Sequence, residues 1–388
     1  MLLLALLIGY GSLFPFDYVP HRPTWADPLH LLTVWPRRLS SSDVVGNVLL
    51  FVPLGWLIPG LARRTSALLA WALAAVAYAW FFQYLQFWFP SRDPSGSDAT
   101  FNTLGLAIGL LLGLATRRFT TWHAARLDRD SPLWPATATL LLLWLAYRWF
   151  PWALTSDLGN FRHAIKALAR DPALELPSAL HDAAAWLLWF WLARRGPFPL
   201  LSTPRAMTVG AVLIVAAEPL FIGNSVSAAD LLGLTLALAL RPLLQRQPSG
   251  GAWLLALLAT SLVVSGLSPW VFGARHHFYW LPFAGMLSGS MVVNTASLIQ
   301  KCYLYGGAVL LLASLLRGFA ARWWIAGLLV AAGLAWIEWM QTHLAGRVAE
   351  ITDPLLALLL ALCFYVAQAR SVSRTSKSAV RALKQPLS

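Results

Sequence analysis

Charge is scarce in this chain of 388 residues, of which only 12% are Asp, Glu, Lys or Arg. Soluble domains carry roughly 25% charged residues, and a soluble fold of this length needs that polar surface to stay in solution. Cysteine is equally scarce, since Cys302 and Cys363 are the only two, which excludes a disulfide scaffold. The 58% of hydrophobic residues exclude a disordered chain. The class that remains is a polytopic membrane protein.

Apolar stretches close to the ~20 residues that cross a bilayer recur along the whole chain, and the mean hydropathy is +0.63. The expected spans cover residues 2–16, 44–62, 66–88, 99–116, 133–152, 179–193, 205–222, 226–240, 252–272, 302–317, 323–343 and 354–369. Residues 280–296 are rich in Gly and Ser and are expected to be re-entrant or interfacial. The first span lacks a basic n-region and a cleavage site, so we expect a retained helix. The sequence predicts an all-α membrane protein with about twelve transmembrane helices.

The net charge of +13 is unevenly distributed between the two sides of these spans. One side holds 18 of the 29 basic residues and two acidic residues, whereas the other holds 11 basic and 14 acidic residues. The positive-inside rule therefore places both termini in the cytoplasm. The charge is an orientation signal, so no nucleic-acid partner is expected. Residues 371–388 form a basic tail that we expect to be disordered, with contact to anionic lipids as an alternative.

Three similar tetrapeptides, about 130 residues apart, indicate an internal repeat. They are Leu13-Phe14-Pro15-Phe16, Trp149-Phe150-Pro151-Trp152 and Trp280-Leu281-Pro282-Phe283. Downstream of the first and third, four polar residues recur with spacings of three, six and six: Gln83, Gln86, Arg92 and Asp98, then Glu338, Gln341, Arg347 and Asp353. The middle copy keeps Glu218 and Asp230 but lacks the Gln and the Arg, with a loop three residues shorter, so we interpret it as degenerate. The prediction is three parallel four-helix repeats at 1–130, 131–250 and 251–370.

The first copy resembles the VanZ-like family of bacterial membrane proteins. The resemblance rests on a set of anchors in fixed order: Asp43-x-x-x-Asn47-x-x-x-Phe51-x-Pro53-x-Gly55, then Gln83-x-x-Gln86, Arg92, Asp98, Asn102 and Gly105. Gln83 replaces the Glu usual in the family, which Glu338 supplies in the third copy. The third copy has Ala357 in place of Asn102, and Lys301 near the position of Asn47. The resemblance implies an envelope protein linked to resistance to the glycopeptide teicoplanin, and it implies no particular reaction.

The anchors predict two Arg-carboxylate-amide clusters at the outer membrane face. An ionisable residue inside a span is costly and normally has a partner in the bundle interior. One interpretation is a pair of polar sites for an anionic or glycan headgroup, because a guanidinium pairs bidentately with a carboxylate or phosphate. The other is that Arg92–Asp98 and Arg347–Asp353 are salt bridges that tether loops. Asp43 and Asn47 complete the first cluster or form a cap and an interhelical hydrogen bond.

Other candidate sites are weaker. No His or Cys spacing indicates a metal site, and no nucleophile, phosphate-loop or dinucleotide motif is present, so no cofactor is expected. Residues 157–176 have an apolar and a basic stripe, which favours an amphipathic helix on the outer surface or packed on the bundle. The favoured hypothesis is a protein that binds a lipid-linked or glycan headgroup. A transporter or flippase is the alternative, and an intramembrane enzyme with Glu338 or His343 as general base ranks last.

Overall fold

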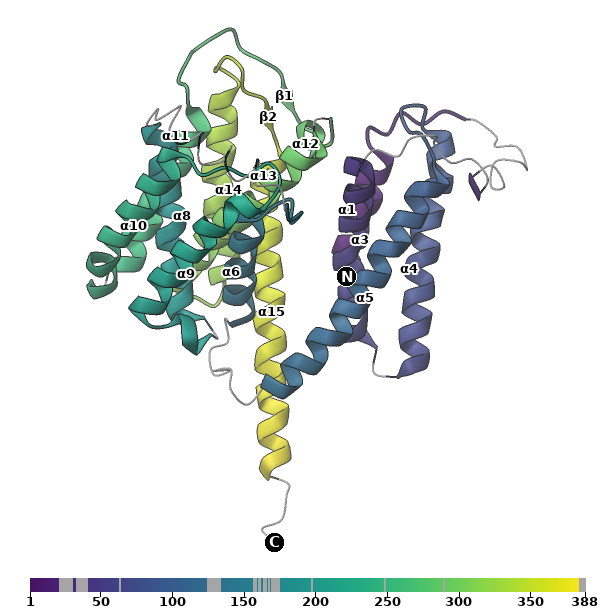
Figure 1. The fold of residues 1–388 in the computed structure, drawn as a ribbon, viewed down its shortest axis with the longest axis horizontal. Coiled ribbons are helices and arrows are strands. Elements are labelled where there is room, and N and C mark those ends of the chain that lie inside the picture. Colours follow the sequence, from purple (N-terminus) through teal and green to yellow (C-terminus); the bar gives the residue numbers. More distant parts are fainter. Residues whose placement is uncertain are drawn as a thin grey trace. The chain divides into compact units, whose positions relative to one another are not determined.

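The computed structural model describes residues 1–20, 31–32, 41–62, 64–123, 134–155, 175–196, 198–247, 249–288 and 290–383, together with residues 159, 162, 166 and 168. The chain forms two compact units, both built from helices (Figure 1). The N-terminal unit comprises Met1–Arg126 with Met286–Val292, and the C-terminal unit comprises Leu127–Gly285 with Val293–Ser388. The amphipathic helix predicted for 157–176 falls largely outside the described residues.

The N-terminal unit packs its helices around a small apolar core. Its described elements are α1 (Leu2–Leu13), α3 (Ser41–Leu61), α4 (Thr65–Leu85), the 3-10 helix η1 (Gln86–Trp88) and α5 (Gly96–His123). Ile8, Phe51, Leu54 and Ile58 are among the buried core residues, and they come from α1 and α3. Other apolar side chains of these helices are exposed, such as Leu73 and Phe81 of α4, so the helices are apolar on their outer faces as well as toward the core.

Helices α3 and α5 approach each other backbone to backbone. A Cβ atom added at Gly55 would meet the Leu106 carbonyl, and one at Gly105 would meet the Val48 carbonyl. Small residues on facing helices allow this close packing in membranes, where apolar burial alone does not hold helices together. The close approach gives a physical reason for the Gly55 and Gly105 positions of the sequence pattern.

The C-terminal unit is larger. Its described helices are α6 (Trp134–Arg148), α8 (Leu176–Arg195), η2 (Pro199–Leu201), α9 (Pro204–Ala217), η3 (Glu218–Leu220), α10 (Ala228–Arg246), α11 (Gly250–Leu267), α13 (Met291–Leu315), α14 (Arg322–Gln341) and α15 (Thr352–Leu383). The short α12 (Ala284–Ser288) spans the boundary after Gly285, and Met291 and Val292 of α13 belong to the N-terminal unit. Two short strands, β1 (Phe278–Tyr279) and β2 (Ala349–Glu350), pair in parallel. The unit is therefore a helical bundle with one small strand pair in its loops.

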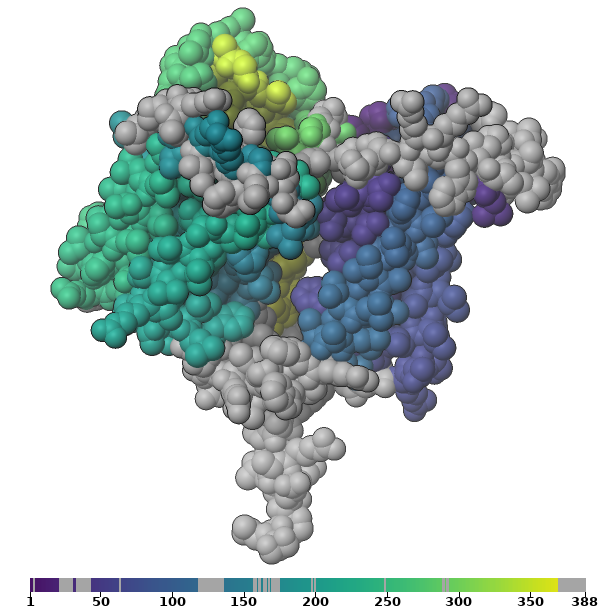
Figure 2. All heavy atoms as spheres, viewed as in Figure 1, coloured from purple at the N-terminus to yellow at the C-terminus, as the bar shows by residue number. Residues whose placement is uncertain are grey.

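An aromatic cluster lies at the centre of this bundle. Trp144 of α6, Trp186 of α8 and Tyr303 of α13 are fully buried, with ring centroids 4.9–5.1 Å apart. The Tyr303 hydroxyl donates to the Ala185 carbonyl at 2.8 Å. Outward-facing side chains are apolar, as on α9 and α10, whose surface is teal to green in Figure 2 and where Val209, Leu213 and Leu243 are exposed.

Seven described helices are long and apolar enough to cross a membrane: α3, α4 with η1, α5, α10, α11, α13 and α14. Three shorter apolar helices, within α1, α6 and α15, accompany them. A helix overlaps each predicted span, but α8 and α9 do not meet the same criteria of length and hydropathy. The structure supports an all-α, multi-pass membrane protein.

Two segments differ from the prediction. Residues 280–296 divide between α12 and the first turns of α13, so α13 begins at Met291 and not near 302. The basic tail continues α15 as a helix to Leu383, whereas we predicted disorder from 371. The segment 371–383 contains neither Gly nor Pro, and nothing in it terminates a helix that is already formed.

Three helices end at a proline followed by an aromatic residue with positive φ. Phe16 after α1, Trp152 after α6 and Trp270 after α11 have φ of 68°, 61° and 65°. In each turn the aromatic N–H donates to the carbonyl three residues earlier, namely that of Leu13, Trp149 and Leu267. The third turn is therefore Ser268-Pro269-Trp270. Our prediction chose Trp280–Phe283 because its letters resemble the other two more closely, but that segment does not end a long helix.

The loops after these turns are held by corresponding backbone bonds. In each loop, the N–H of the fourth residue after the proline donates to a backbone carbonyl at the end of a later hairpin. The bonds run from Val19 to Trp88, from Thr155 to Leu220, and from Gly273 to His343. These bonds place Glu218 at the position of Gln86 and Gln341, and not at that of Gln83 and Glu338. Each of the three then precedes its Asp by twelve residues, so the middle loop is not shortened as we predicted.

Candidate functional site

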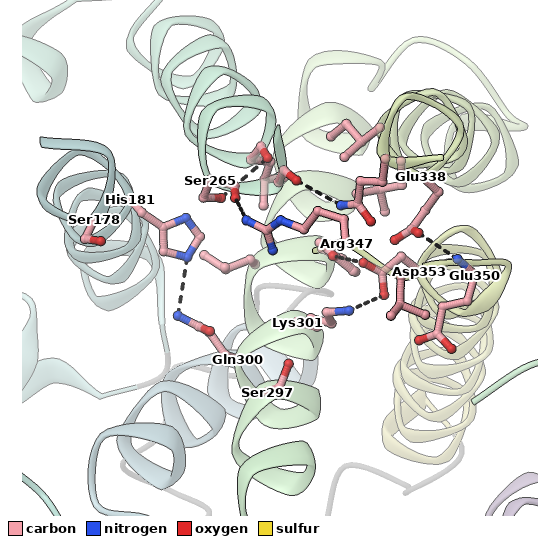
Figure 3. A pocket seen from close by; sticks show the side chains of 18 of the residues that line it. Ser178, His181, Ser265, Ser297, Gln300, Lys301, Glu338, Arg347, Glu350 and Asp353 are labelled. Atoms are coloured by element: carbon pink, nitrogen blue, oxygen red, sulfur yellow. Dashed lines mark hydrogen bonds and ion pairs between the residues drawn. The ribbon is translucent and has the colours of Figure 1, made fainter. Parts of the chain in front are cut away.

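A cavity of about 550 Å³ opens between helices of the C-terminal unit. Figure 3 shows side chains pointing toward it from α8, α11, α13, α14, α15 and the segment before α15. Most of the labelled groups are polar, although these helices are apolar outside. The charged lining side chains are Asp182, Asp230, Lys301, Glu338, Arg347, Glu350 and Asp353.

Lys301 and Asp353 form an ion pair on one side of this cavity. The Lys301 Nζ atom lies 2.6 Å from Asp353 Oδ1, and the Tyr305 hydroxyl donates to Asp353 Oδ2 at 2.5 Å. Both donors come from α13, one turn apart, while Asp353 lies in the first turn of α15. The Lys301 side chain is 32% exposed and that of Asp353 only 8%. Lys301 is therefore the more accessible member of the pair, and two donors from α13 fix the buried carboxylate.

Glu338 is a buried carboxylate on α14 with one backbone partner. Its Oε2 atom accepts the Glu350 N–H at 2.8 Å. The Glu350 side chain accepts the Gly285 N–H at 3.1 Å. Both residues line the cavity, so two further carboxylates face it from the α14–α15 side (Figure 3).

Arg347 and Gln341 bind the C-terminal end of α11. The Arg347 guanidinium donates from Nη2 to the Ser265 carbonyl at 2.9 Å and from Nε to the Ser268 carbonyl at 2.8 Å. The Gln341 amide donates to the Gly266 carbonyl at 3.0 Å. The last carbonyls of a helix have no partner within the helix, so these side chains satisfy them. Arg347 and Gln341 line the cavity and also hold its wall together.

A buried charge network forms the opposite wall. The Arg148 guanidinium lies 2.5 Å from Glu218 Oε1, 2.8 Å from Asp230 Oδ1 and 3.9 Å from Asp182 Oδ1. Asp230 also caps α10, in a capping box with Ser227. The Arg148 guanidinium lies over the rings of Trp144 and Trp186, 5.5 and 5.8 Å from their centroids. One cation thus serves three carboxylates, two of which line the cavity.

The predicted anchors of the N-terminal unit hold its helix ends in the same manner. The Gln86 amide donates to the Ser12 carbonyl and the Arg92 guanidinium to that of Gly11, both at 2.8 Å. Ser12 and Gly11 precede Pro15 by three and four residues, as Gly266 and Ser265 precede Pro269. Burial lowers the pKa of Arg92, opposed by Asp17, but arginine stays protonated at neutral pH.

The remaining N-terminal anchors lie nearby. The Gln83 side chain accepts the Ser95 N–H at 3.2 Å, as Glu338 accepts that of Glu350. Asp98 is bonded to Asn47, and Asp43 is near enough to repel its charge. Asp43 itself is exposed, and Asn102 is buried. The structure therefore brings Asn47 and Asp98 together.

Neither predicted salt bridge is present in the described part of the chain. The ion pairs found there involve Arg148 and Lys301, and none joins Arg92 to Asp98 or Arg347 to Asp353. Both arginines instead bind backbone carbonyls at the C-terminal ends of α1 and α11, because a helix end offers several free acceptors at once. The predicted salt bridges are therefore wrong, and the two arginines bind backbone carbonyls in their place.

Sequence analysis missed Arg148, Asp182, Lys301 and Tyr305 as site residues. The first three are ionisable and lie in or beside predicted spans, so a survey of every intramembrane charge would have found them. Tyr305 carries no such signal. Its role depends on the packing of α13 against α15. His343, predicted as a candidate base, contacts Thr342 and Trp339 and is not part of the cavity lining.

The comparisons with known proteins concern the N-terminal part. No curated protein and no solved structure matches this chain. The family model described as VanZ/LLP1 matches residues 1–117. This match covers the anchors from Asp43 to Asn102 and confirms the predicted resemblance there: residues 1–117 are a VanZ-like segment.

Proposed function

We propose that this chain is a VanZ-like integral membrane protein of the bacterial envelope that binds a lipid-linked or glycan headgroup in the cavity of its C-terminal unit. The observation that carries the proposal is a polar cavity of about 550 Å³ between helices whose outer faces are apolar. Small-molecule sites typically occupy ~300–1,000 Å³. Charged side chains inside a membrane bundle are costly and commonly mark a binding site or pathway.

The charges of the lining favour a hydroxyl-rich ligand over a strongly anionic one. Two cations, Lys301 and Arg347, face five carboxylates, those of Asp182, Asp230, Glu338, Glu350 and Asp353. Carboxylates accept hydrogen bonds from hydroxyl groups, while Gln300, Ser297 and Lys301 supply donors. A sugar headgroup matches this mixture. Of the two ligand classes expected from sequence, the glycan is the better supported.

The proposed link to glycopeptide resistance can be tested with an isosteric change. Glu338→Gln keeps the oxygen that accepts the Glu350 N–H and removes the carboxylate charge from the cavity. Glu175→Gln makes the same change at an exposed position outside the lining. We expect Glu338→Gln, and not Glu175→Gln, to lower teicoplanin resistance and the amount of lipid-linked glycan that copurifies. Equal behaviour of the two variants at normal expression would contradict the proposal.

A transporter or flippase is the second candidate, and the same cavity supports it. Ionised groups within a bundle serve substrate pathways as well as static sites. Reconstitution of the full chain in vesicles distinguishes the two functions. A headgroup-dependent flux of labelled lipid would favour the transporter, and its absence with retained binding would favour the binding protein.

We also propose three parallel copies of one four-helix repeat, at 1–130, 131–250 and 251–370, with both termini in the cytoplasm. Support comes from the corresponding turns at Pro15, Pro151 and Pro269 and from the loop bonds that follow them. In the middle copy, the Asn224 amide donates to the Arg148 carbonyl at 3.0 Å. Asn224 lies six residues after Glu218, where the other copies have arginine, and it binds the carbonyl three residues before Pro151, which corresponds to the carbonyls of Ser12 and Gly266 that Gln86 and Gln341 bind.

A further inference from the structure

A second, smaller cavity of about 130 Å³ lies in the C-terminal unit, where α8 and α10 end and α11 begins. Three arginines line it: Arg194 and Arg195, the last residues of α8, and Arg241 of α10. Trp191, Gln245 and Gln247 supply the other side-chain N–H donors of the lining. Leucines, one phenylalanine and two glycines complete it. The cavity is separate from the proposed glycan site, with which it shares no lining residue.

Neutral groups hold the three guanidinium groups in place. Arg194 Nη1 donates to Gln245 Oε1 at 3.3 Å. The Arg195 guanidinium lies over the Trp191 ring, 4.3 Å from its centroid. Arg241 donates to the Pro204 carbonyl at 3.1 Å and to the Thr208 hydroxyl at 3.2 Å. These contacts orient the cations and leave their charge uncompensated.

The chain segments that line this cavity contain no carboxylate side chain. Segments 183–217 and 231–337 contain no Asp and no Glu. Those segments include residues 183–195 of α8, all of α9, α11 and α13, and all of α10 after Asp230. Among the described residues, no ion pair involves Arg194, Arg195 or Arg241. Arg194 and Arg317 instead lie close enough to Arg195 to repel its charge.

Two buried N–H donors add to this excess of positive charge. Trp191 Nε1 and Gln245 Nε2 are buried and have no acceptor in the described part of the chain. Buried donors are nearly always satisfied in folded proteins, and the exceptions call for a ligand or another specific reason. Cations and N–H groups without an acceptor in one cavity are together the arrangement that an anion completes.

We propose that this cavity binds the phosphate group of an anionic phospholipid. Its volume is below the ~300 Å³ of ordinary small-molecule sites and suits one phosphate group. Leu187, Leu244 and Leu254 line the cavity. Leu243 and Trp253 are exposed on α10 and α11, on which the acyl chains would lie. Basic sites between membrane helices bind anionic headgroups in this way. Inorganic phosphate has the same oxygen chemistry and is the other source to be tested.

The test compares two lipids on the purified full chain. Binding of phosphatidylglycerol and of zwitterionic phosphatidylcholine is measured by native mass spectrometry after reconstitution in nanodiscs of each lipid. We expect a preference for phosphatidylglycerol that Arg195→Gln weakens about fivefold, the effect of one basic group at a membrane surface. Trp191→Phe keeps the ring below Arg195 and removes the N–H, and it is expected to weaken the same preference.

Arg246→Gln is the matched control, because Arg246 is the exposed last residue of α10 and lies outside the cavity lining. It should retain the wild-type preference. Equal binding of the two lipids, or equal losses in Arg195→Gln and Arg246→Gln, would overturn the proposal. Displacement of the lipid by inorganic phosphate at similar affinity would assign the site to the free ion and contradict the lipid. Thermal unfolding of each variant verifies that the bundle is intact.

Discussion

Arg148 is the residue on which the buried charges of the C-terminal unit converge. It comes from α6, whereas Asp182, Glu218 and Asp230 come from α8, η3 and α10. The side chains of Arg148 and Glu218 are each only 5% exposed. A buried cation with several carboxylates is held by its partners and cannot be removed without leaving them uncompensated.

Replacing this cation is expected to destabilise the protein strongly. Arg148→Met removes the charge with little loss of volume and leaves three carboxylates unpaired, so we expect a loss of about 3–5 kcal/mol in the free energy of unfolding. Combining it with Glu218→Gln should recover part of the loss, because the pair is coupled. Chemical unfolding in detergent measures both. A double variant as unstable as the sum of the two single variants would show that the pair is not coupled.

Lys301 has the corresponding role on the other side of the cavity. Lys301→Met removes the cation beside the buried Asp353 and leaves that carboxylate with Tyr305 and Glu338, and we expect a loss of about 2 kcal/mol. Lys301→Asn copies the first unit, where Asn47 bonds Asp98, and should cost less than Lys301→Met. Thermal unfolding of the three proteins ranks them. If Lys301→Asn were less stable than Lys301→Met, Lys301 and Asn47 would not have equivalent roles in the two units.

Single site residues were predictable from sequence where a charged or polar side chain interrupts an apolar run. Their bonding partners were not predictable. Glu338, Gln341, Arg347 and Asp353 were predicted as one cluster, and the structure brings all four to one cavity. The partners of Arg347 are backbone carbonyls of α11, and no sequence pattern indicates a bond to a carbonyl. Lys301 was aligned with Asn47 and then left out of the site, since its pairing depends on the packing of α13 against α15.

At the scale of elements, α3 and α5 show how a short motif fixes the distance between two helices. A Cβ atom at Gly109 would meet the backbone of Val52 and Trp56, neither of which can move independently of α3. We expect Gly109→Ala to force the helices apart and to cost about 1–3 kcal/mol of stability.

Gly60→Ala is the control for this prediction. Gly60 also lies in α3, but an added Cβ would meet nothing within 4 Å. Alanine has the higher helix propensity, so Gly60→Ala should be neutral or stabilise by up to about 1 kcal/mol. The comparison uses thermal unfolding in detergent, and similar melting temperatures for the two variants would exclude close backbone packing of α3 on α5.

The helices themselves were predictable because the length of an apolar stretch is a strong signal. The residues at which they end were not predictable. The middle hairpin was shifted by three residues in the predicted alignment, because Glu218 is the same residue type as Glu338 but occupies the position of Gln341. The backbone N–H groups of Phe89, Phe221 and Leu344 donate to the carbonyls of Gln86, Glu218 and Gln341, and these bonds, with the loop bonds described above, reveal the correspondence. In the middle hairpin, the residue type therefore does not indicate the position in the fold.

At the scale of the whole molecule, the asymmetry of charge predicts a topology that the fold of the C-terminal unit makes testable. α13 has 25 residues and is one of the candidate spans. The segments before and after it therefore lie on opposite sides of the membrane if it crosses. Ala274 is exposed in the segment before α13, and Gly318 is exposed in the segment after it.

Cysteine labelling of these two positions tests the orientation. In a chain with Cys302 and Cys363 replaced by Ala, we expect a membrane-impermeant maleimide to label Ala274→Cys in intact spheroplasts. Gly318→Cys, beside the basic residues Arg317 and Arg322, should be labelled only after permeabilisation, because basic connections stay in the cytoplasm. Labelling of both in intact spheroplasts would mean that α13 does not span. The reverse pattern would mean that the whole bundle is inverted, which would also move the arginine cavity at the ends of α8 and α10 to the outer leaflet.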